Sequence, residues 1–316
     1  MDAGRRRSIE ELKTMALEKR SLFARLTIAI PFLWLALFFL LPFLIVFKIS
    51  LSGDAVAQPP YVPVLNFSEG WTTLRDKLAL LDFENYAFVL GDWLYVYSYM
   101  QSLLLAAFST AILVLVGYPV AYAIARSPRG LRPILLLLVI LPFFTSFLIR
   151  VYAWIGILSR EGLLNQLLLL LGVIVQPLEI LSTNVAVVIG MVYSYLPFMV
   201  LPLYAALEKM DDSLLEAAAD LGATPSQAFW RVTVPVSMPG IIAGALLCFI
   251  PAVGEFVIPD LLGGSDTQMI GRTVWNEFAV NRSWSVSSAL AILILLVLLV
   301  PILIYQRMQL RELESR

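Results

Sequence analysis

The sequence predicts an all-α polytopic membrane protein with six transmembrane helices. Of its 316 residues, 60% are hydrophobic and only 14% are charged, and the mean hydropathy is +0.85. Soluble domains carry about 25% charged residues. Six apolar runs are long enough to cross about 30 Å of hydrocarbon, which takes roughly 20 helical residues. Composition and run length together therefore favour a helical membrane bundle.

The six predicted spans follow one another along the chain. They are residues 26–47, 98–125, 133–158, 180–207, 232–254 and 283–306, the third interrupted by Arg150 and the fifth by several prolines. With a cytoplasmic N-terminus, fifteen of the 22 basic residues lie in inner segments. This distribution agrees with the positive-inside rule. We therefore expect both termini in the cytoplasm.

A seventh uncharged run, residues 162–178, is too short and too polar to count as a span. It contains three side-chain amides and Pro177, and a seventh span would place Arg307 and Arg311 outside. Short apolar runs are more often interfacial or re-entrant. We interpret this run as a helix lying on, or dipping into, the outer face.

The spans divide the chain into segments with different expected roles. We expect a cytoplasmic amphipathic segment at residues 1–25, a permease domain at 26–306 with a large outer loop at 49–97 and a cytoplasmic loop at 208–239, and a cytoplasmic tail at 307–316. The outer loop is longer than a simple connection requires, and such loops are usually functional or disordered. Docking of an external partner and an ordinary aromatic belt both remain open for it.

The sequence offers little for catalysis. It has no His, its single cysteine (Cys248) lies in an apolar run, and it has no phosphate-binding G-x-x-x-x-G-K-[ST] motif. No residues are spaced as a metal site, and the net charge of −1 does not suggest nucleic acid as a partner. We expect a transport subunit in a lipid bilayer that is not an enzyme and holds no cofactor or metal itself.

One segment that we expect in the cytoplasm has the start and stop signals of two short helices. "DDSLLEAAAD" begins with good N-cap residues, and Gly222 is a natural stop because glycine adopts the left-handed conformation easily. "TPSQ" then predicts a new helix, with Thr224 and Gln227 as a capping box. The result is a helix–turn–helix elbow with an acidic, small-residue face. From the residues alone, the elbow either docks a partner or packs under its own bundle.

The elbow resembles a known motif. "EAAADLG", followed by "RVTVP", is similar to the EAA loop of permease subunits of bacterial binding-protein-dependent ABC importers. The family's usual Leu-Pro stands here as Val234-Pro235, which is a mild departure. Three further stretches, "LPFLIVFKISL", "LLLLVILPFFTSFLIRVYAW" and "FIPAVGEFVIPDLLGG", resemble the first permease of putrescine/spermidine importers.

The resemblance implies a fold, partners and a set of coupling residues. The fold would be that of ABC type I importer permeases, in the bacterial inner membrane, with the EAA segment as a cytoplasmic coupling helix. The partners would be a second homologous permease, a dimer of ATPase subunits that bind ATP and Mg, and a periplasmic polyamine-binding protein. The matching coupling residues are Glu216, Ala217, Ala218, Asp220 and Gly222.

A polyamine path should offer carboxylates and aromatic faces to a multivalent cation. Glu255 lies about 22 Å above Gly240 at 1.5 Å per residue, and a charge at the bilayer centre costs about 2.5–3.5 kcal/mol on insertion scales. We therefore expect Glu255 to face a cavity or a partner. The other candidate path or gate residues are Asp260, Arg150, Tyr152, Trp154 and Tyr193. An internal Arg150–Glu255 ion pair and simple aromatic packing are the alternatives.

Two other classes of function remain as alternatives. An ion-coupled secondary carrier would also be an apolar bundle with a buried glutamate, but it needs no docking elbow and should show inverted repeats. An ABC importer for another small solute would share the elbow. An anion permease, however, would more plausibly place basic residues in the path, where Glu255, Asp260 and Glu277 stand here.

Overall fold

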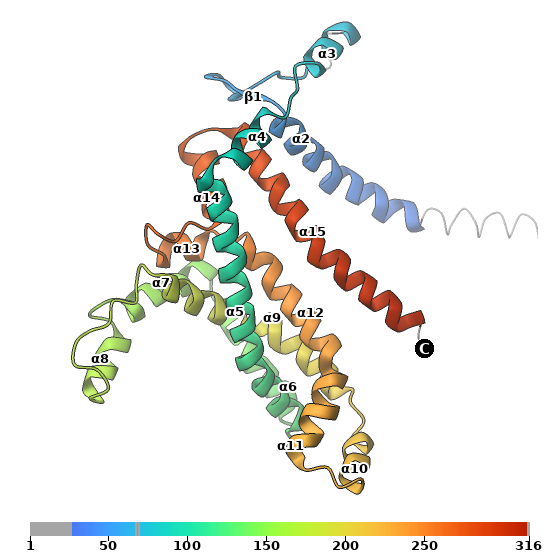
Figure 1. The fold of residues 1–316 in the computed structure, drawn as a ribbon, viewed down its shortest axis with the longest axis vertical. Coiled ribbons are helices and arrows are strands. Elements are labelled where there is room, and N and C mark those ends of the chain that lie inside the picture. Colours follow the sequence, from blue (N-terminus) through green and yellow to red (C-terminus); the bar gives the residue numbers. More distant parts are fainter. Residues whose placement is uncertain (1–26, 67, 69, 315–316) are drawn as a thin grey trace, which may run out of the picture.

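The structure of the protein is a computed structural model that describes residues 27–66, 68 and 70–314, with the side chains described as far as residue 307. The expected amphipathic segment at residues 1–25 lies outside this part of the chain. The described residues are predominantly helical (Figure 1).

In the part of the chain that the structure describes, five helices are long and apolar enough to cross a membrane. They are Thr27–Ser50, which includes η1 (Ala36–Leu40) and α2 (Leu41–Ser50); α5 (Trp93–Arg126); α9 (Asn184–Glu208); Pro225–Val253, which joins α11 (Pro225–Ala228), η4 (Phe229–Thr233) and α12 (Val234–Val253); and Trp284–Arg307 within α15 (Trp284–Glu314). These helices correspond to five of the six predicted spans.

The third predicted span is not one straight helix. It consists of α6 (Arg132–Ile140) and η3 (Leu141–Phe144), followed by α7 (Phe147–Leu158), and the two arms meet at 88°. Pro142 tightens the first arm, and both the amide and the hydroxyl of Thr145 donate to its carbonyl oxygen. Thr145 and Ser146 are then extended, which prevents the helix from continuing. The count reaches six when this bent pair is taken as one span.

The seventh uncharged run, residues 162–178, is only partly helical. It contains α8 (Leu163–Leu170), and the return segment after α8 is irregular. The buried side chain of Asn165 holds this segment, because it donates to the Leu178 carbonyl oxygen (2.9 Å) and accepts from the Leu178 amide (2.8 Å). The short helix is as expected, whereas its place at the outer face stays a prediction.

The core lies where α5, α9 and α12 pack together. Met199 of α9 is fully buried between Gly117 of α5 and Gly244 of α12. A Cβ atom at Gly117 would lie 2.8 Å from Met199 Cγ, and one at Gly244 would lie 2.9 Å from Met199 Sδ. The two glycines therefore let the three helices approach closely.

One end of the bundle, termed here the elbow end, carries α10 (Ser213–Asp220) and α11 (Figure 1). The opposite loop end carries β1 (Gly53–Asp54) and β2 (Tyr61–Val62), which pair antiparallel with Gly53 opposite Val62, and the helices α3 (Trp71–Leu78) and α4 (Glu84–Gly91). The first helix and α15 pack together near the loop end and diverge from the α5–α9–α12 core along their length (Figure 1).

Three short helices connect α12 to α15. They are α13 (Val257–Leu262), α14 (Ile270–Trp275) and η5 (Asn276–Val280). The loop between α13 and α14 is fixed to α5, because Gln101 accepts from the Gln268 amide (2.8 Å) and Ser102 accepts from the Ile270 amide (2.7 Å). This connection places Glu255 and Asp260 beside the core helices.

Candidate functional site

The elbow, defined as residues 211–233, forms as its sequence predicts. Gly222 has φ +81°, and the Ala223 amide donates to the Ala218 carbonyl oxygen while the Gly222 amide donates to that of Ala219, which is the Schellman ending. Thr224 and Gln227 form the predicted capping box, with Pro225 in the first turn. The Ser213 amide donates to Asp211 and lowers the pKa of that carboxylate. Local hydrogen bonds therefore set the shape of the elbow.

Aromatic and charged contacts fix the elbow to the bundle. The ring of Phe229 packs edge-to-face against Tyr118 and Tyr122 of α5, with centroids 5.6 and 5.7 Å apart. Arg126 at the end of α5 forms an ion pair with Asp212. These contacts join the elbow to a membrane-length helix, so a force on the elbow would reach α5.

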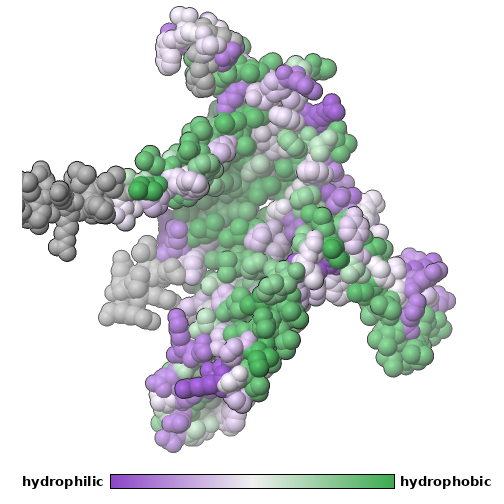
Figure 2. Space-filling model, turned by 180° about the vertical axis from the view of Figure 1, so that it is seen from behind, coloured by the Kyte–Doolittle hydropathy of each residue, from purple (hydrophilic) through white to green (hydrophobic). Residues whose placement is uncertain are grey.

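The face of the elbow that points away from the bundle is not covered by the described part of the chain. No residue of α10 is buried, and Glu216, Ala217 and Asp220 are exposed. Leu221 is 89% exposed and Trp230 is 66% exposed, so two large apolar side chains of the elbow are uncovered as well. The alternative that the elbow packs under its own bundle therefore does not describe α10. Figure 2 shows hydrophilic residues at this end and long hydrophobic surfaces between the two ends.

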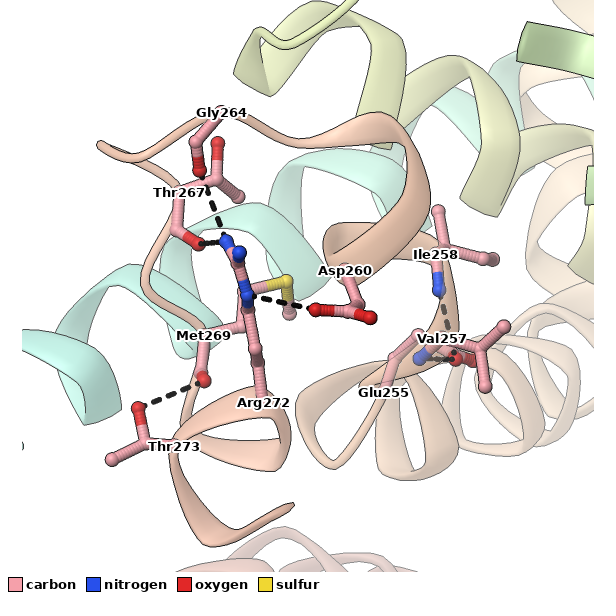
Figure 3. A network of polar contacts seen from close by, with 9 residues as sticks. All are labelled: Glu255, Val257, Ile258, Asp260, Gly264, Thr267, Met269, Arg272 and Thr273. Atoms are coloured by element: carbon pink, nitrogen blue, oxygen red, sulfur yellow. Dashed lines mark hydrogen bonds and ion pairs between the residues drawn. The ribbon is translucent and has the colours of Figure 1, made fainter. Parts of the chain in front are cut away.

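Glu255 lies at a break between helices, as its flanking glycine and prolines predict. α12 ends at Val253 and α13 begins at Val257. Oε1 of Glu255 accepts from the amides of Val257 (3.0 Å) and Ile258 (3.4 Å), so the carboxylate caps α13 (Figure 3). Oε2 accepts from the hydroxyl of Tyr195 in α9 (2.5 Å). A half-buried carboxylate is thus held by three donors.

Asp260 is paired rather than free. Its Oδ1 lies 3.2 Å from Nε of Arg272, and Nη1 of Arg272 donates to the carbonyl oxygens of Gly264 (3.0 Å) and Thr267 (3.3 Å). Figure 3 shows Arg272 between Asp260 and the α13–α14 loop. Arg272 therefore neutralises Asp260 and orders the loop.

Arg150 does not form the alternative ion pair with Glu255. Its guanidinium lies over the ring of Phe143 (4.6 Å) and near that of Phe147 (5.8 Å). Phe143 packs edge-to-face on Phe198, and Phe198 lies beside Tyr195, with centroids 5.3 and 6.3 Å apart. Three aromatic rings, the last of them Tyr195, therefore connect the Arg150 guanidinium to Glu255. We name Arg150, Phe143, Phe198, Tyr195 and Glu255 the charged row.

The charged row lies far from the elbow end of the bundle. Arg132 and Glu208 form a 3.6 Å ion pair where α6 begins and α9 ends, at the elbow end. Tyr195 lies about 20 Å along α9 from Glu208 at 1.5 Å per residue. A hydrocarbon core is about 30 Å thick. The charged row therefore stands within the length that a membrane would cover.

The remaining predicted aromatics lie elsewhere. Trp154 packs edge-to-face on Tyr193 with centroids 5.4 Å apart, and Tyr152 is 57% exposed. The structure thus brings Tyr195, and not Tyr193, to Glu255. Spacing along the chain does not distinguish the two tyrosines, although in the structure Tyr195 shares a face with Met191 and Met199, four residues to either side, and both are buried. Among the described residues, no cluster of three or more acidic or cysteine side chains could hold a metal ion.

A bundle of membrane-length helices with a fixed, exposed elbow and a carboxylate at membrane depth defines the class of membrane permeases. Residues 114–313 match the family described as "Binding-protein-dependent transport system inner membrane component". The chain belongs to this family. It is therefore an inner-membrane transport subunit and not an enzyme, as the resemblance of the elbow implies.

Curated relatives cover nearly the whole chain. It is 41% identical over 286 residues to the spermidine/putrescine transport system permease protein PotB of Haemophilus influenzae, covering 90% of this chain and 93% of the relative. It is 40% identical over 275 residues to PotB of Escherichia coli K12, covering 87% and 93%.

Solved structures share the fold. A bacterial ABC transporter involved in the import of the acidic polysaccharide alginate superposes with a TM-score of 0.67 at 17% identity, covering 95% of this chain and 99% of that chain. The MetNI methionine ABC transporter superposes with a TM-score of 0.53 at 19% identity, covering 68% and 94%. These likenesses confirm the predicted ABC importer permease fold.

Proposed function

We propose that this chain is a permease subunit of an ATP-driven importer that moves polyamines delivered by a periplasmic binding protein. The relatives at 40–41% identity are spermidine/putrescine permeases, which supports this cargo. The observation that carries the proposal is Glu255, a half-buried carboxylate at membrane depth. We propose an orientation in which the elbow and both termini face the cytoplasm and the loop end faces the periplasm.

The elbow is the proposed contact with an ATPase subunit. Its free face combines the carboxylates of Glu216 and Asp220 with the small side chains of Ala217 and Ala218 and the exposed Leu221. Small residues let another surface approach closely, and exposed apolar side chains beside charges are typical of protein interfaces. ATP and Mg belong to the ATPase, and Gly222 sets the angle at which α10 meets it.

Glu255 and Tyr195 form the proposed cation path with the other polar residues near them. A primary or secondary ammonium group donates hydrogen bonds to carboxylate oxygens. A polyamine would therefore replace Tyr195 as the donor to Glu255. The ring faces of Phe198 and Tyr195 offer cation–π contacts along the same row. Asp260 becomes available only when Arg272 releases it.

Uptake by the whole complex in proteoliposomes tests the proposal. Radiolabelled putrescine and spermidine, binding protein and ATP are supplied, and ATP hydrolysis is recorded alongside. We expect Glu216→Lys to uncouple or release the ATPase and Glu255→Gln to lose uptake in an assembled complex. Glu161→Gln serves as the control, because Glu161 is an exposed acidic residue just before α8.

Each negative result has a distinct meaning. If the wild-type complex moves neither polyamine, the substrate assignment is wrong while membership of the transport family stands. If Glu255→Gln transports normally, the path does not run through Glu255. If Glu216→Lys couples normally, α10 is not the contact with the ATPase.

A further inference from the structure

A small polar hollow of about 260 Å³ lies near the loop end, between the start of α5 and the segment that contains α14 and η5. Leu94 gives it one apolar wall. Most of its other walls are polar side chains, namely Ser265, Gln268, Thr273, Asn276, Glu277 and Asn281. Pockets for drug-sized molecules measure about 300–1,000 Å³, so this hollow suits a smaller, polar ligand.

Glu277 supplies the one carboxylate of this hollow, and it is half-buried. Its Oε1 accepts from the hydroxyl of Tyr95 (3.0 Å), and its Oε2 accepts from the side-chain amide of Asn281 (3.1 Å). Both donors are neutral. In the part of the chain that the structure describes, no lysine or arginine forms an ion pair with Glu277. Each oxygen of a carboxylate can accept a further hydrogen bond, so Glu277 can still bind a cation that donates.

Arg272 also lines the hollow, but its guanidinium is engaged elsewhere. Its Nε lies 3.2 Å from the carboxylate of Asp260, and its Nη1 donates to two carbonyl oxygens of the α13–α14 loop (Figure 3). Arg272 therefore balances Asp260 and leaves the charge of Glu277 uncompensated. Because Arg272 contacts both, the hollow adjoins Asp260, which follows Glu255 on α13.

The lining suits an organic ammonium group better than a metal ion. Calcium takes six to eight oxygen ligands, commonly with several carboxylates, and no group of three acidic or cysteine side chains among the described residues could hold a metal. A primary ammonium group donates three hydrogen bonds. Glu277 and the side-chain amide oxygens of Asn276 and Gln268 can accept them, while Leu94 offers an apolar wall to a methylene chain.

The arrangement at Glu277 repeats the one at Glu255. Tyr195 of α9 donates to Glu255, and Tyr95 of α5 donates to Glu277. Both carboxylates belong to the connection between α12 and α15. The two tyrosine–glutamate pairs therefore lie in series, one near the loop end and the other at membrane depth.

We propose that the hollow around Glu277 binds a primary alkylammonium group and is the first cation site that the cargo meets on its way to Glu255. This inference rests on the proposed function for the identity of the cargo. Glu277 acts through its charge, because a cleft lined by one sign of charge concentrates ions of the opposite sign. Loss of that charge should therefore remove the preference for cations without changing the shape of the hollow.

Cysteine modification in the assembled complex tests this charge preference without any polyamine. Asn276→Cys places a thiol in the hollow, and Cys248, the single native cysteine of this chain, is buried. After correction for their rates with a free thiol, we expect the cationic reagent aminoethyl methanethiosulfonate to react about tenfold or more faster than its anionic sulfonatoethyl analogue. The cationic reagent is itself a primary alkylammonium.

Three second substitutions separate the charge of Glu277 from its structural contacts. Glu277→Gln should abolish the preference while its amide oxygen still accepts from Tyr95. Tyr95→Phe removes the hydrogen bond and keeps the charge, so the preference should remain. Glu84→Gln, which removes an exposed carboxylate of α4 at the same end of the bundle, is the matched control and should also keep it. Equal rates for the two reagents, or a preference that survives Glu277→Gln, would overturn the inference.

Protection of the same thiol tests whether the cargo occupies the hollow. We expect putrescine or spermidine to slow the cationic reagent about tenfold in the Asn276→Cys complex, and sodium chloride of equal ionic strength to slow it much less. Glu277→Gln should remove the protection. A wild-type complex that takes up polyamine while the thiol is unprotected would overturn the place of Glu277 in the path. If the wild type takes up neither polyamine, the proposed cargo is wrong, and the reagent preference alone decides whether the hollow is an alkylammonium site.

Discussion

The hydroxyl of Tyr195 donates a 2.5 Å hydrogen bond to Oε2 of Glu255, joining the middle of α9 to the break between α12 and α13. The same carboxylate caps α13 through Oε1. A cation that approaches Glu255 therefore competes with Tyr195 and disturbs the start of α13. Binding at this point would be felt by two helices of the bundle, which is what an alternating-access transporter requires.

Tyr195→Phe should separate the hydrogen bond from the packing of the ring. It leaves Oε2 of Glu255 without its protein donor, at a cost of about 1–3 kcal/mol. We expect lower thermal stability, and a polyamine concentration for half-maximal uptake that falls about tenfold, because the cation no longer competes with the Tyr195 hydroxyl for Oε2. Tyr193→Phe is the matched control, because the structure gives the Tyr193 ring a contact with Trp154 and its hydroxyl no hydrogen bond in the described chain. Equal behaviour of the two variants would contradict the role of Tyr195.

Phe229→Ala and Trp230→Ala should have different effects although the residues are neighbours. Phe229 packs against Tyr118 and Tyr122, and each aromatic pair contributes about 0.5–1.5 kcal/mol beyond its buried area. We expect Phe229→Ala to increase hydrogen exchange in the elbow and to lower uptake per ATP hydrolysed. Trp230 is 66% exposed and packs only edge-to-face on Phe229, with centroids 5.2 Å apart, so Trp230→Ala should raise exchange in the free permease less than Phe229→Ala does and should weaken ATPase binding. If Trp230→Ala increased exchange and Phe229→Ala weakened only ATPase binding, Trp230 would face the bundle and Phe229 the ATPase.

Gly222→Ala should strain the turn that orients α10. A left-handed conformation costs an L-residue about 1–2 kcal/mol. Gly222 has φ +81°, and no atom lies within 4 Å of the place that an added Cβ atom would take, so backbone strain is the only cost. We expect faster exchange in α10 and reduced stimulation of ATP hydrolysis by the binding protein. Gly130→Ala, at a position with open space and no positive φ, should behave as wild type. Normal coupling in Gly222→Ala would show that the angle of α10 is not critical.

The elbow was predictable because its structure is local. Gly222, Thr224 and Gln227 make their hydrogen bonds within a few residues, so capping rules suffice. The 88° bend was not, because hydropathy is high on both sides of Thr145 and says nothing about direction. The contacts of Tyr195 and Arg150 could not be predicted for a related reason. Which aromatic meets Glu255, and whether Arg150 finds a carboxylate, depends on how α6, α7, α9 and α13 pack across long sequence separations.

Gly240→Ala tests the close approach of α12 and α9 that supports the charged row. A Cβ atom at Gly240 would lie 2.5 Å from Ala206 Cβ and 2.9 Å from the Pro202 carbonyl oxygen, so the helices would have to separate. Overpacking of a tight core costs about 1–3 kcal/mol, and we expect a lower melting temperature of the purified complex. Gly156→Ala in α7 meets nothing within 4 Å and should be neutral or slightly stabilising, because alanine favours a helix interior by about 0.5–1 kcal/mol. If both variants have the melting temperature of the wild type, the α9–α12 contact tolerates more separation than its geometry indicates. The charged row then cannot depend on the close approach of these two helices.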